Sequence, residues 1–175
     1  MLTNLCSKGI YDHLDGGISR YAVDEKWIIP HFEKMLYDNI QFIDLLTKFY
    51  QNTKNNYFKN KLLQTIHYFN NEFKNNEKLY GSAYDADSEG VEGKYYVWSY
   101  EELKNLLKED IKLLENKYQI SESGNFEGNN ILVEKNLILD EDKNNLDQIM
   151  NKLLNIRRKR IKPFFDDKSQ TDLNS

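Results

Sequence analysis

Cysteine is almost absent from this 175-residue sequence, in which Cys6 stands alone. A single cysteine can form neither an intrachain disulfide nor a C-x-x-C redox pair, so the composition does not favour a secreted, disulfide-stapled protein. No apolar run approaches the roughly 20 residues that a membrane-spanning helix needs, and the first residues lack the basic start and apolar core of a signal peptide. We therefore expect a cytoplasmic protein without a membrane partner.

An excess of positive charge is also missing. The 24 Lys and Arg residues are outnumbered by 28 Asp and Glu, which gives a formal net charge of −4. No broad electropositive field is available to attract nucleic acid or anionic lipid, so we expect no nucleic-acid partner. One basic run stands out, RRKR at 157–160. We interpret it as the exposed end of an amphipathic helix, favoured there by the helix dipole. A patch that contacts phosphate is the alternative.

Aromatic residues are plentiful, at 13% of the chain, so we expect a folded protein, and the length is that of one domain. Apolar residues at steps of three and four predict helices. These helices cover roughly 31–50, 58–73, 100–118 with a break after 110, and 141–162. Ser99 and Glu102 form a capping box that starts the third of them.

A change of pattern interrupts the helices. Two short aromatic segments, 79–84 and 94–98, flank an acidic turn that contains glycine, which predicts a β-hairpin. Each helix has one apolar stripe and needs neighbours to cover it. The predicted fold class is therefore mainly α, made of helical hairpins with a small inserted β-hairpin.

The segment HFEKMLYD is a candidate site because it is dense in ionisable side chains. On a helix, His31, Lys34 and Asp38 would share one face, with Glu33 and Tyr37 on an adjacent face. A histidine near its neutral pKa, oriented by a carboxylate, could act as a general base. The alternative is a surface helix with ion pairs, Lys34 with Asp38 being one.

The preceding segment, YDHLDGGISRY, is a candidate binding loop. Its Gly-Gly pair permits positive φ angles and close approach of a ligand. Arg20 could bind a carboxylate or phosphate through two bonds, and Tyr21 offers a stacking face and a hydroxyl donor. The alternative is a turn in which Arg20 pairs with Asp24 or Asp12. We expect His13 to be a structural hydrogen bonder more than a base.

Three carboxylates alternate in the segment YDADSEG. In an extended chain Asp85, Asp87 and Glu89 would point the same way, and their charges would repel without a cation, a proton or an arginine. Calcium binding is one reading, although the twelfth position of an EF-hand loop would be Tyr96 and not glutamate. A carboxylate pair for glycoside chemistry is another. A solvated acidic turn is the third.

Four segments carry a resemblance to a known family. In chain order they read GIYDHLDGGISRYAVDEKWIIPHFEKMLYDN, YGSAYDADSEGVEGKYYVW, GNFEGNNIL and RKRIKPFFDDK. Together they span nearly the whole chain and resemble the spermatogenesis-associated protein 20 family, whose members join a thioredoxin-like domain to an (α/α)6 toroid. That toroid is similar to the N-acylglucosamine 2-epimerase and six-hairpin glycosidase folds. Asp15 departs from the family, which usually has glycine there.

The resemblance implies that residues 1–175 form a single partial α/α-toroid domain, an internal fragment of the family's toroid. The thioredoxin-like domain is absent from this sequence. After DDK the family usually has a Trp-Asn-Gly, which this chain lacks. A decayed or split gene is therefore a further interpretation, and we expect such a piece to aggregate or to fold only in part.

The resemblance also implies a function, which is to bind a small polar or sugar-like ligand in the toroid funnel. If the protein is an enzyme, its chemistry would be sugar epimerase- or isomerase-like proton transfer, or glycoside hydrolysis. The catalytic residues would be His31, Asp85 and Asp87. The ligand-binding residues would be His13, Arg20, Tyr21, Glu33, Tyr37 and Asp38. No metal and no cofactor are expected. The alternative is a non-catalytic scaffold or binding module whose partner is a thioredoxin-like domain or the missing remainder of the toroid.

Overall fold

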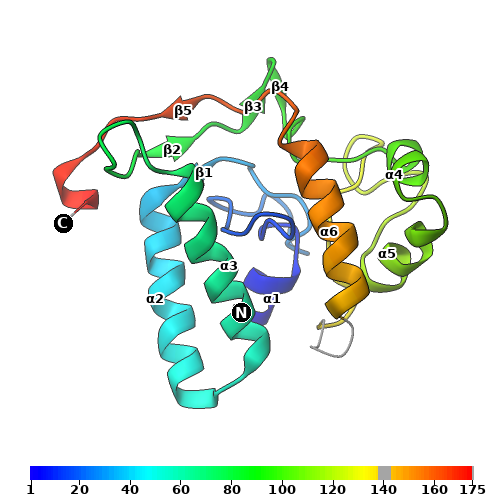
Figure 1. Cartoon of the computed structure of the whole chain (residues 1–175), viewed down its shortest axis with the longest axis horizontal. Helices are drawn as coiled ribbons and strands as arrows, with labels where there is room; N and C mark the ends of the chain where they lie inside the picture. The colour runs from blue at the N-terminus through cyan, green and yellow to red at the C-terminus, as the bar shows by residue number, and fades with distance from the viewer. Residues whose placement is uncertain (138–142, 175) are drawn as a thin grey trace.

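The computed structural model describes residues 1–137 and 143–174. Its helices stand in two groups on either side of a stretch of irregular chain (Figure 1). They are α1 (Leu2–Ser7), α2 (Leu36–Thr53), α3 (Asn56–Glu72), α4 (Tyr100–Leu107), α5 (Ile111–Lys117) and α6 (Lys143–Arg157), with the 3-10 helices η1 (Lys108–Asp110) and η3 (Thr171–Leu173). The strands are β1 (Lys34–Met35), β2 (Ala83–Tyr84), β3 (Asp87–Ser88), β4 (Val91–Glu92) and β5 (Phe165–Asp166). A mainly helical chain with helical hairpins is thus confirmed. In the part of the chain described, no helix combines the length and the apolar character needed to cross a membrane.

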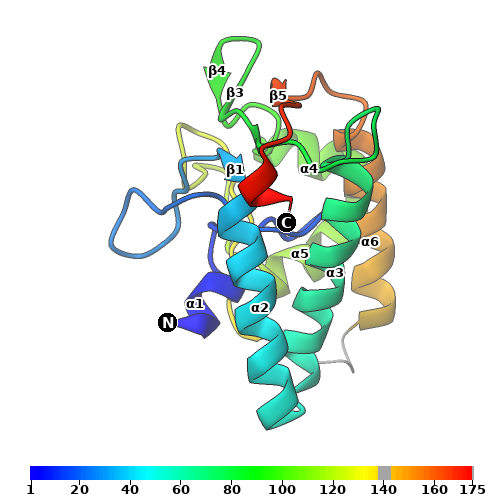
Figure 2. The same ribbon diagram turned by 90° about the vertical axis from the view of Figure 1, so that its left-hand side faces the viewer.

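The first helical hairpin consists of α2 and α3, which lie side by side at the left edge of Figure 1 and nearest the viewer in Figure 2. Its turn has two local causes. Lys54 ends α2 in the left-handed conformation, with φ 54°. Asn55 caps α3, its side chain accepting a hydrogen bond of 2.9 Å from the backbone N–H of Tyr57. The stripes that these helices bury with α1 include Cys6, Phe42, Leu46, Phe58 and Leu62.

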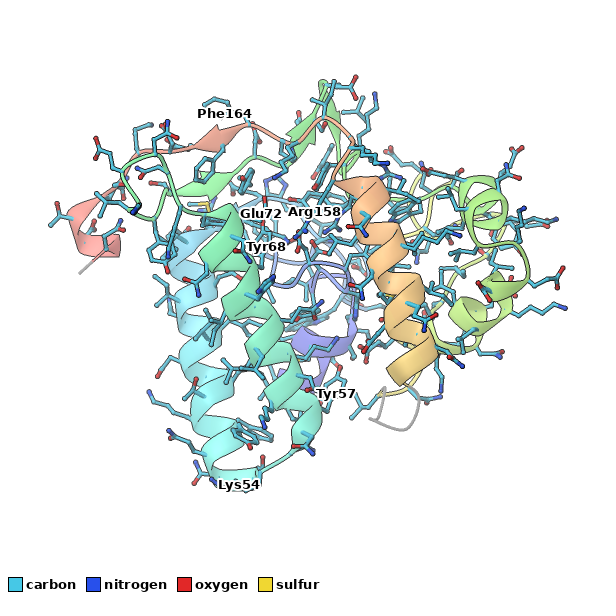
Figure 3. The ribbon with its side chains drawn as sticks, viewed as in Figure 1. Lys54, Tyr57, Tyr68, Glu72, Arg158 and Phe164 are labelled. Carbon is cyan, nitrogen blue, oxygen red and sulfur yellow. The ribbon has the colours of Figure 1, made fainter. Side chains whose placement is uncertain are left out.

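The second helical group, α4 to α6, has a core of its own. Helix α4 begins where the capping box predicts, because Ser99 Oγ accepts a hydrogen bond of 3.1 Å from the backbone N–H of Glu102. The buried core of this group includes Trp98, Leu103, Leu107, Leu114, Leu146 and Leu153. Helix α6 runs beside α3, and Glu72 at the end of α3 faces Arg158 just beyond α6 (Figure 3). The expected start of α6 near residue 141 lies outside the described residues.

A three-stranded antiparallel sheet, in the order β1–β2–β5, lies above α2 and α3 in Figure 1. Its register pairs Lys34 with Tyr84 and Ala83 with Asp166. The predicted pairing of 79–84 with 94–98 is therefore wrong. Strand β2 takes both of its partners from distant parts of the chain, and such pairing leaves no mark on the local sequence pattern.

The small hairpin lies inside the acidic turn itself. Strands β3 and β4 pair Asp87 with Glu92. The chain reverses at Glu89 and Gly90, whose φ angles are 55° and 73°. Two successive positive φ angles match the twist of a tight hairpin. An inserted β-hairpin is confirmed, although it is shorter than predicted.

Helix α2 begins at Leu36 and not at His31 as predicted. Strand β1 takes up the two residues before it, and Phe32 has a φ of 28°, which is incompatible with a helix. The prediction that His31, Lys34 and Asp38 share one helical face is therefore wrong. The backbone separates these side chains and leads each to different partners.

Candidate functional site

A buried carboxylate, Asp12, holds three segments of the chain together. Its Oδ1 and Oδ2 each accept a hydrogen bond of 2.8 Å from the guanidinium of Arg157, and Oδ2 accepts another of 2.8 Å from Lys34 Nζ. The side chains of Arg157 and Lys34 are only 2% and 1% exposed. Burial alone would raise the pKa of Asp12, but the charges of Arg157 and Lys34 outweigh burial and hold that pKa well below its usual range. Asp12 is therefore ionised in the folded protein at neutral pH.

Lys34 has further partners that compensate its burial. Its Nζ donates to the backbone carbonyl of Gly16 at 2.9 Å and lies 4.1 Å from the centre of the Tyr68 ring. Burial lowers the pKa of Lys34, and the charge of Asp12 opposes that shift. Gly16 and Gly17 take positive φ angles of 97° and 79°, as the sequence predicts for this pair. The predicted Lys34–Asp38 ion pair is wrong, since Lys34 is buried against Asp12.

The prediction of an exposed helix end at 157–160 holds for Arg158 and Lys159, which are exposed, but not for the whole run. Its first residue, Arg157, ends α6 and is among the most buried side chains. The sequence carried a signal for this position: Arg157 continues the buried stripe of α6 after Leu146, Ile149 and Leu153. A cation on such a stripe needs a buried anionic partner, because an unpaired buried charge is costly.

Two more arginines of the basic run join the end of α6 to its neighbours. Arg158 donates to Asp15 Oδ1 at 2.9 Å. Arg160 donates to both carboxylate oxygens of Glu102, at 2.9 and 3.0 Å, and its guanidinium lies 3.9 Å from the centre of the Trp98 ring. These ion pairs occupy the arginine side chains, which weakens the phosphate-contact interpretation. Asp15, the departure from the family pattern, thus has a charged partner here.

A second buried network surrounds Glu134, a residue that sequence reasoning missed. Its Oε1 accepts from Lys61 Nζ at 2.7 Å, and its Oε2 accepts from the Tyr57 hydroxyl at 2.8 Å. Burial alone would raise the pKa of Glu134, but the Lys61 charge and the hydrogen bonds around it lower that pKa to about 2. Lys61 and Tyr57 lie four residues apart on α3, so this network fixes α3 to the chain that precedes α6.

His13 belongs to the second network, with a fully buried side chain. Its Nε2 lies 3.1 Å from the carbonyl of Lys8, so this nitrogen carries the proton and donates it. Its Nδ1 lies 3.3 Å from both Lys61 Nζ and Glu134 Oε1, and in the neutral ring this nitrogen accepts from Lys61. Burial lowers the pKa of His13, and the charge of Lys61 lowers it further. The contacts fit the structural role that the sequence favours for this residue.

Four of the predicted ligand-binding residues gather at the start of α2. The guanidinium of Arg20 donates to Glu33 Oε2 at 3.0 Å, and the backbone N–H of Arg20 donates to the Glu33 carbonyl at 2.8 Å. The hydrogen bond to Glu33, followed by the charges of Tyr37 and Glu33 and, more weakly, of Asp38, raises the pKa of Arg20. Asp38 Oδ2 is buried and has no hydrogen-bond partner among the described residues, and burial raises the pKa of Asp38. We term Arg20, Glu33 and Asp38 the rim cluster.

The loop that carries Arg20 is an irregular hairpin, which the sequence did not reveal. The backbone N–H of His31 donates to the Tyr21 carbonyl at 3.0 Å. Asp24 closes the tip by accepting hydrogen bonds from the backbone N–H groups of Lys26 and Ile29, at 3.0 and 2.7 Å. The expected pair of Arg20 with Asp24 or Asp12 is therefore wrong, because both carboxylates have other partners.

His31 lies on the surface of this hairpin, with about a third of its side chain exposed. Its ring stacks on Tyr21, with 4.9 Å between ring centres and an interplanar angle of 14°. Its Nδ1 lies 3.1 Å from Oε1 of Glu92 in β4, a partner that the sequence did not predict. An imidazole with a carboxylate on one nitrogen, and with part of the ring open to solvent, has the arrangement of a general acid or base.

Asp85 and Asp87 are both exposed, and the residues between and beside them are buried. The expected alternation of this segment is thus confirmed. Asp85 Oδ1 accepts a hydrogen bond from the Ala86 backbone N–H at 2.7 Å, and Glu89 pairs with Lys94 at 2.9 Å. Among the described residues, no group of three or more His, Cys, Asp or Glu side chains is placed to hold a metal ion.

Comparison with known proteins places this chain among named relatives. Mouse spermatogenesis-associated protein 20 is 34% identical over 140 residues, which cover 71% of this chain and 18% of the mouse protein. The family is thereby established. The chain belongs to the spermatogenesis-associated protein 20 family. The human protein of that name is 28% identical over 95% of this chain and 26% of its own length. An uncharacterised Caenorhabditis elegans protein is 28% identical over 97% of this chain and 28% of its own length.

No family model matches the sequence. The chain spans between about a fifth and about a quarter of the length of the relatives it matches. Within this family member, the Asp12 network and the rim cluster lie in the segments that carry the resemblance or next to them. Lys61 and Glu134, which the resemblance did not point to, lie outside the quoted motifs.

Replacing Arg157 should destabilise the protein strongly. In Arg157→Met the Asp12 carboxylate loses its two-bond partner and keeps Lys34 as its one charged partner, beside two backbone N–H donors. We therefore expect a loss of about 3–5 kcal/mol in the free energy of unfolding. Lys159→Met, at an exposed position of the same basic run, should change it by no more than about 0.5 kcal/mol. Urea unfolding of the two variants measures both values. Equal effects would show that the buried pair contributes no more than a surface charge.

Stability should fall on mild acidification because of His13. Its pKa is lower in the folded protein than the usual 6.5, so below pH 6.5 the unfolded chain binds a proton that the folded chain does not. The contribution of His13 to the free energy of unfolding is fully present above pH 6.5. It is lost as pH falls, by at most about 1.4 kcal/mol per pH unit. Urea unfolding from neutral to mildly acidic pH measures the slope. His13→Gln should flatten the slope of the unfolding free energy against pH. His67→Gln, on the exposed face of α3, should leave that slope unchanged. An unchanged slope in His13→Gln contradicts the assignment.

Proposed function

We propose that this chain supplies one wall of a site for a small polar, sugar-like ligand. The observation that carries the proposal is the rim cluster, in which the unpartnered buried oxygen of Asp38 lies near Arg20 and Glu33. Carboxylate and guanidinium groups close together can accept from and donate to the hydroxyls of a sugar. Tyr21, stacked on His31 at the same hairpin, adds an aromatic face. The site would be completed by parts of the family domain that this chain does not contain.

If the family domain is an enzyme, sugar epimerase- or isomerase-like proton transfer and glycoside hydrolysis are the reactions we favour. His31 would transfer the proton, and Glu92 would fix the orientation and tautomer of its ring. Asp87 or Asp85 would supply the second carboxylate that either reaction needs. The wider proposal is a partial (α/α)6 toroid, acting in the cytoplasm and belonging to a family that also carries a thioredoxin-like domain. The helical hairpins support it.

The ligand proposal can be tested by titrating the isotope-labelled chain with glucose and N-acetylglucosamine at millimolar concentrations. We expect amide shifts confined to residues 20–38. Arg20→Ala removes charge-assisted hydrogen bonds and should weaken binding about tenfold or more, and His31→Ala should weaken it as well. Lys26→Ala, at the exposed tip of the same hairpin, is the control and should bind as the parent does. Absence of shifts with both sugars, or an equal loss in Lys26→Ala, would count against the site.

A second candidate function is a non-catalytic scaffold, and an apolar hollow favours it. The hollow has a volume of about 200 Å³ and is lined mainly by residues of α2 and α3, the two helices nearest the viewer in Figure 2. Its lining includes Ile40, Ile43, Ile66, Phe69 and Tyr80. Ile40 is 44% exposed, whereas Leu36 and Phe69 in the same hollow are buried. We propose that this face packs against the remainder of the family toroid or against the thioredoxin-like domain.

The apolar hollow should make the chain self-associate when it is studied alone, because large exposed apolar patches drive association. We expect sedimentation velocity to detect oligomers that grow with concentration. Ile40→Glu places a charge in the hollow and should shift the chain toward monomer. Leu45→Glu, at a similarly exposed position of α2 outside the hollow, should not. A chain that stays monomeric at high concentration, or variants that behave alike, would contradict the docking role.

A further inference from the structure

A cleft of about 400 Å³ lies between α3 and α6, away from the rim cluster. Figure 3 shows both helices, with Tyr57 labelled near the start of α3. The volume of the cleft falls in the range of small-molecule sites, about 300–1,000 Å³. The side chains that line it come from both helices and from the chain beneath them. On α3 these include Asn60, Lys61 and Gln64; on α6 they include Leu146, Asp147, Met150 and Asn151.

The floor of this cleft is rigid and electrically balanced. Lys61 and Glu134 lie there as an ion pair of 2.7 Å, and Glu134 also accepts from the Tyr57 hydroxyl. His13 beside them is neutral, because its Nδ1 accepts from Lys61 while its Nε2 donates to a backbone carbonyl. The floor therefore adds no net charge, and its donors and acceptors are already used within the protein.

The α6 wall is different, because its polar groups are unused. Asp147 and Asn151 lie one helical turn apart on the same face. Neither makes a hydrogen bond or an ion pair with any residue that the structure describes. Both residues are exposed to solvent, and Asp147 is the one charged side chain without an ion-pair partner among the described side chains that line the cleft. Met150 on the same wall is partly exposed and provides apolar surface, and Leu146 beside it is buried.

We propose that the cleft between α3 and α6 binds a small organic amine that also carries hydroxyl or amide groups. Its ammonium group would pair with Asp147, and its neutral polar groups would bond to the amide of Asn151. Met150 and Leu146 would cover its carbon skeleton. A neutral polyol would leave Asp147 unpaired, and an anion would be repelled by it, so the charge of Asp147 selects for a cation. This site is separate from the rim cluster and goes beyond the proposed sugar-like ligand.

The probe is glucosamine, compared with glucose, which has a similar shape without the ammonium charge. Both are titrated into the isotope-labelled chain at neutral pH and low salt. We expect glucosamine to shift the amides of residues 146–151 and to bind at least about fivefold more tightly than glucose there, with added salt weakening the difference. Asp147→Asn should abolish that preference. Asp110→Asn, an exposed aspartate on η1, should keep it.

Two further variants decide between this cleft and other sources of binding. Met150→Lys places an ammonium group inside the cleft and should block glucosamine, while circular dichroism checks that the helices persist. Arg20→Ala, in the rim cluster, should leave the shifts at 146–151 unchanged. The proposal is overturned if glucose and glucosamine bind equally at these residues, or if Asp147→Asn binds as the parent does. It is also overturned if neither probe shifts residues 146–151 at millimolar concentration, whatever happens at the rim.

Discussion

The ion pair between Asp12 and Arg157 is the contact on which the rest of this structure depends. It joins residues 145 positions apart and, through Lys34, links the N-terminal segment, the entry to α2 and the end of α6. Asp12 carries one negative charge against the two positive charges of Arg157 and Lys34, and the carboxylate of Asp15, 3.8 Å from Arg157, supplies the second negative charge. Removal of one leaves a charge in a low-dielectric interior, which costs several kcal/mol. Any shift of β1 or of α6 along its axis would separate these partners, so the network fixes the register of both.

A second constraint follows from the Glu134 network, because it fixes α3 to the chain before α6. Helices α3 and α6 are joined by ion pairs at one end, where Arg158 and Lys162 meet Glu72, and through the charged floor between them. Their facing side chains do not interlock along the whole length, and a cleft of about 400 Å³ remains. The cleft is thus a consequence of joining helices through buried charges. Its floor is held rigid by the same charges.

Sequence patterns predicted the helices better than the strands, for a physical reason. Apolar stripes and the Ser99 cap act within a few residues, so α3 and α4 could be predicted closely. A two-residue strand has no periodicity and pairs with distant chain, so the sequence pattern assigns the residues of β1 to the first turn of α2. The density of special side chains did locate the rim cluster. Glu92, the partner of His31, and Glu134, the partner of Lys61, lie in segments without a recognisable pattern. Only the fold places them beside these partners. The stripe position of Arg157 was the one local clue to burial.

The partner of His31 limits the chemistry that this hairpin could contribute. Glu92 is within hydrogen-bond reach of the imidazole, so it can fix the ring but is then less free to act on a ligand. Strands β3 and β4 pair Asp87 directly with Glu92, and directly opposed residues of an antiparallel pair share one face of the sheet. Asp87 therefore lies on the same face of the hairpin as Glu92 and His31, on the strand next to that of Glu92. Asp85 precedes the hairpin. Of the two acids expected from the resemblance, Asp87 is the better placed to act together with His31 on one ligand.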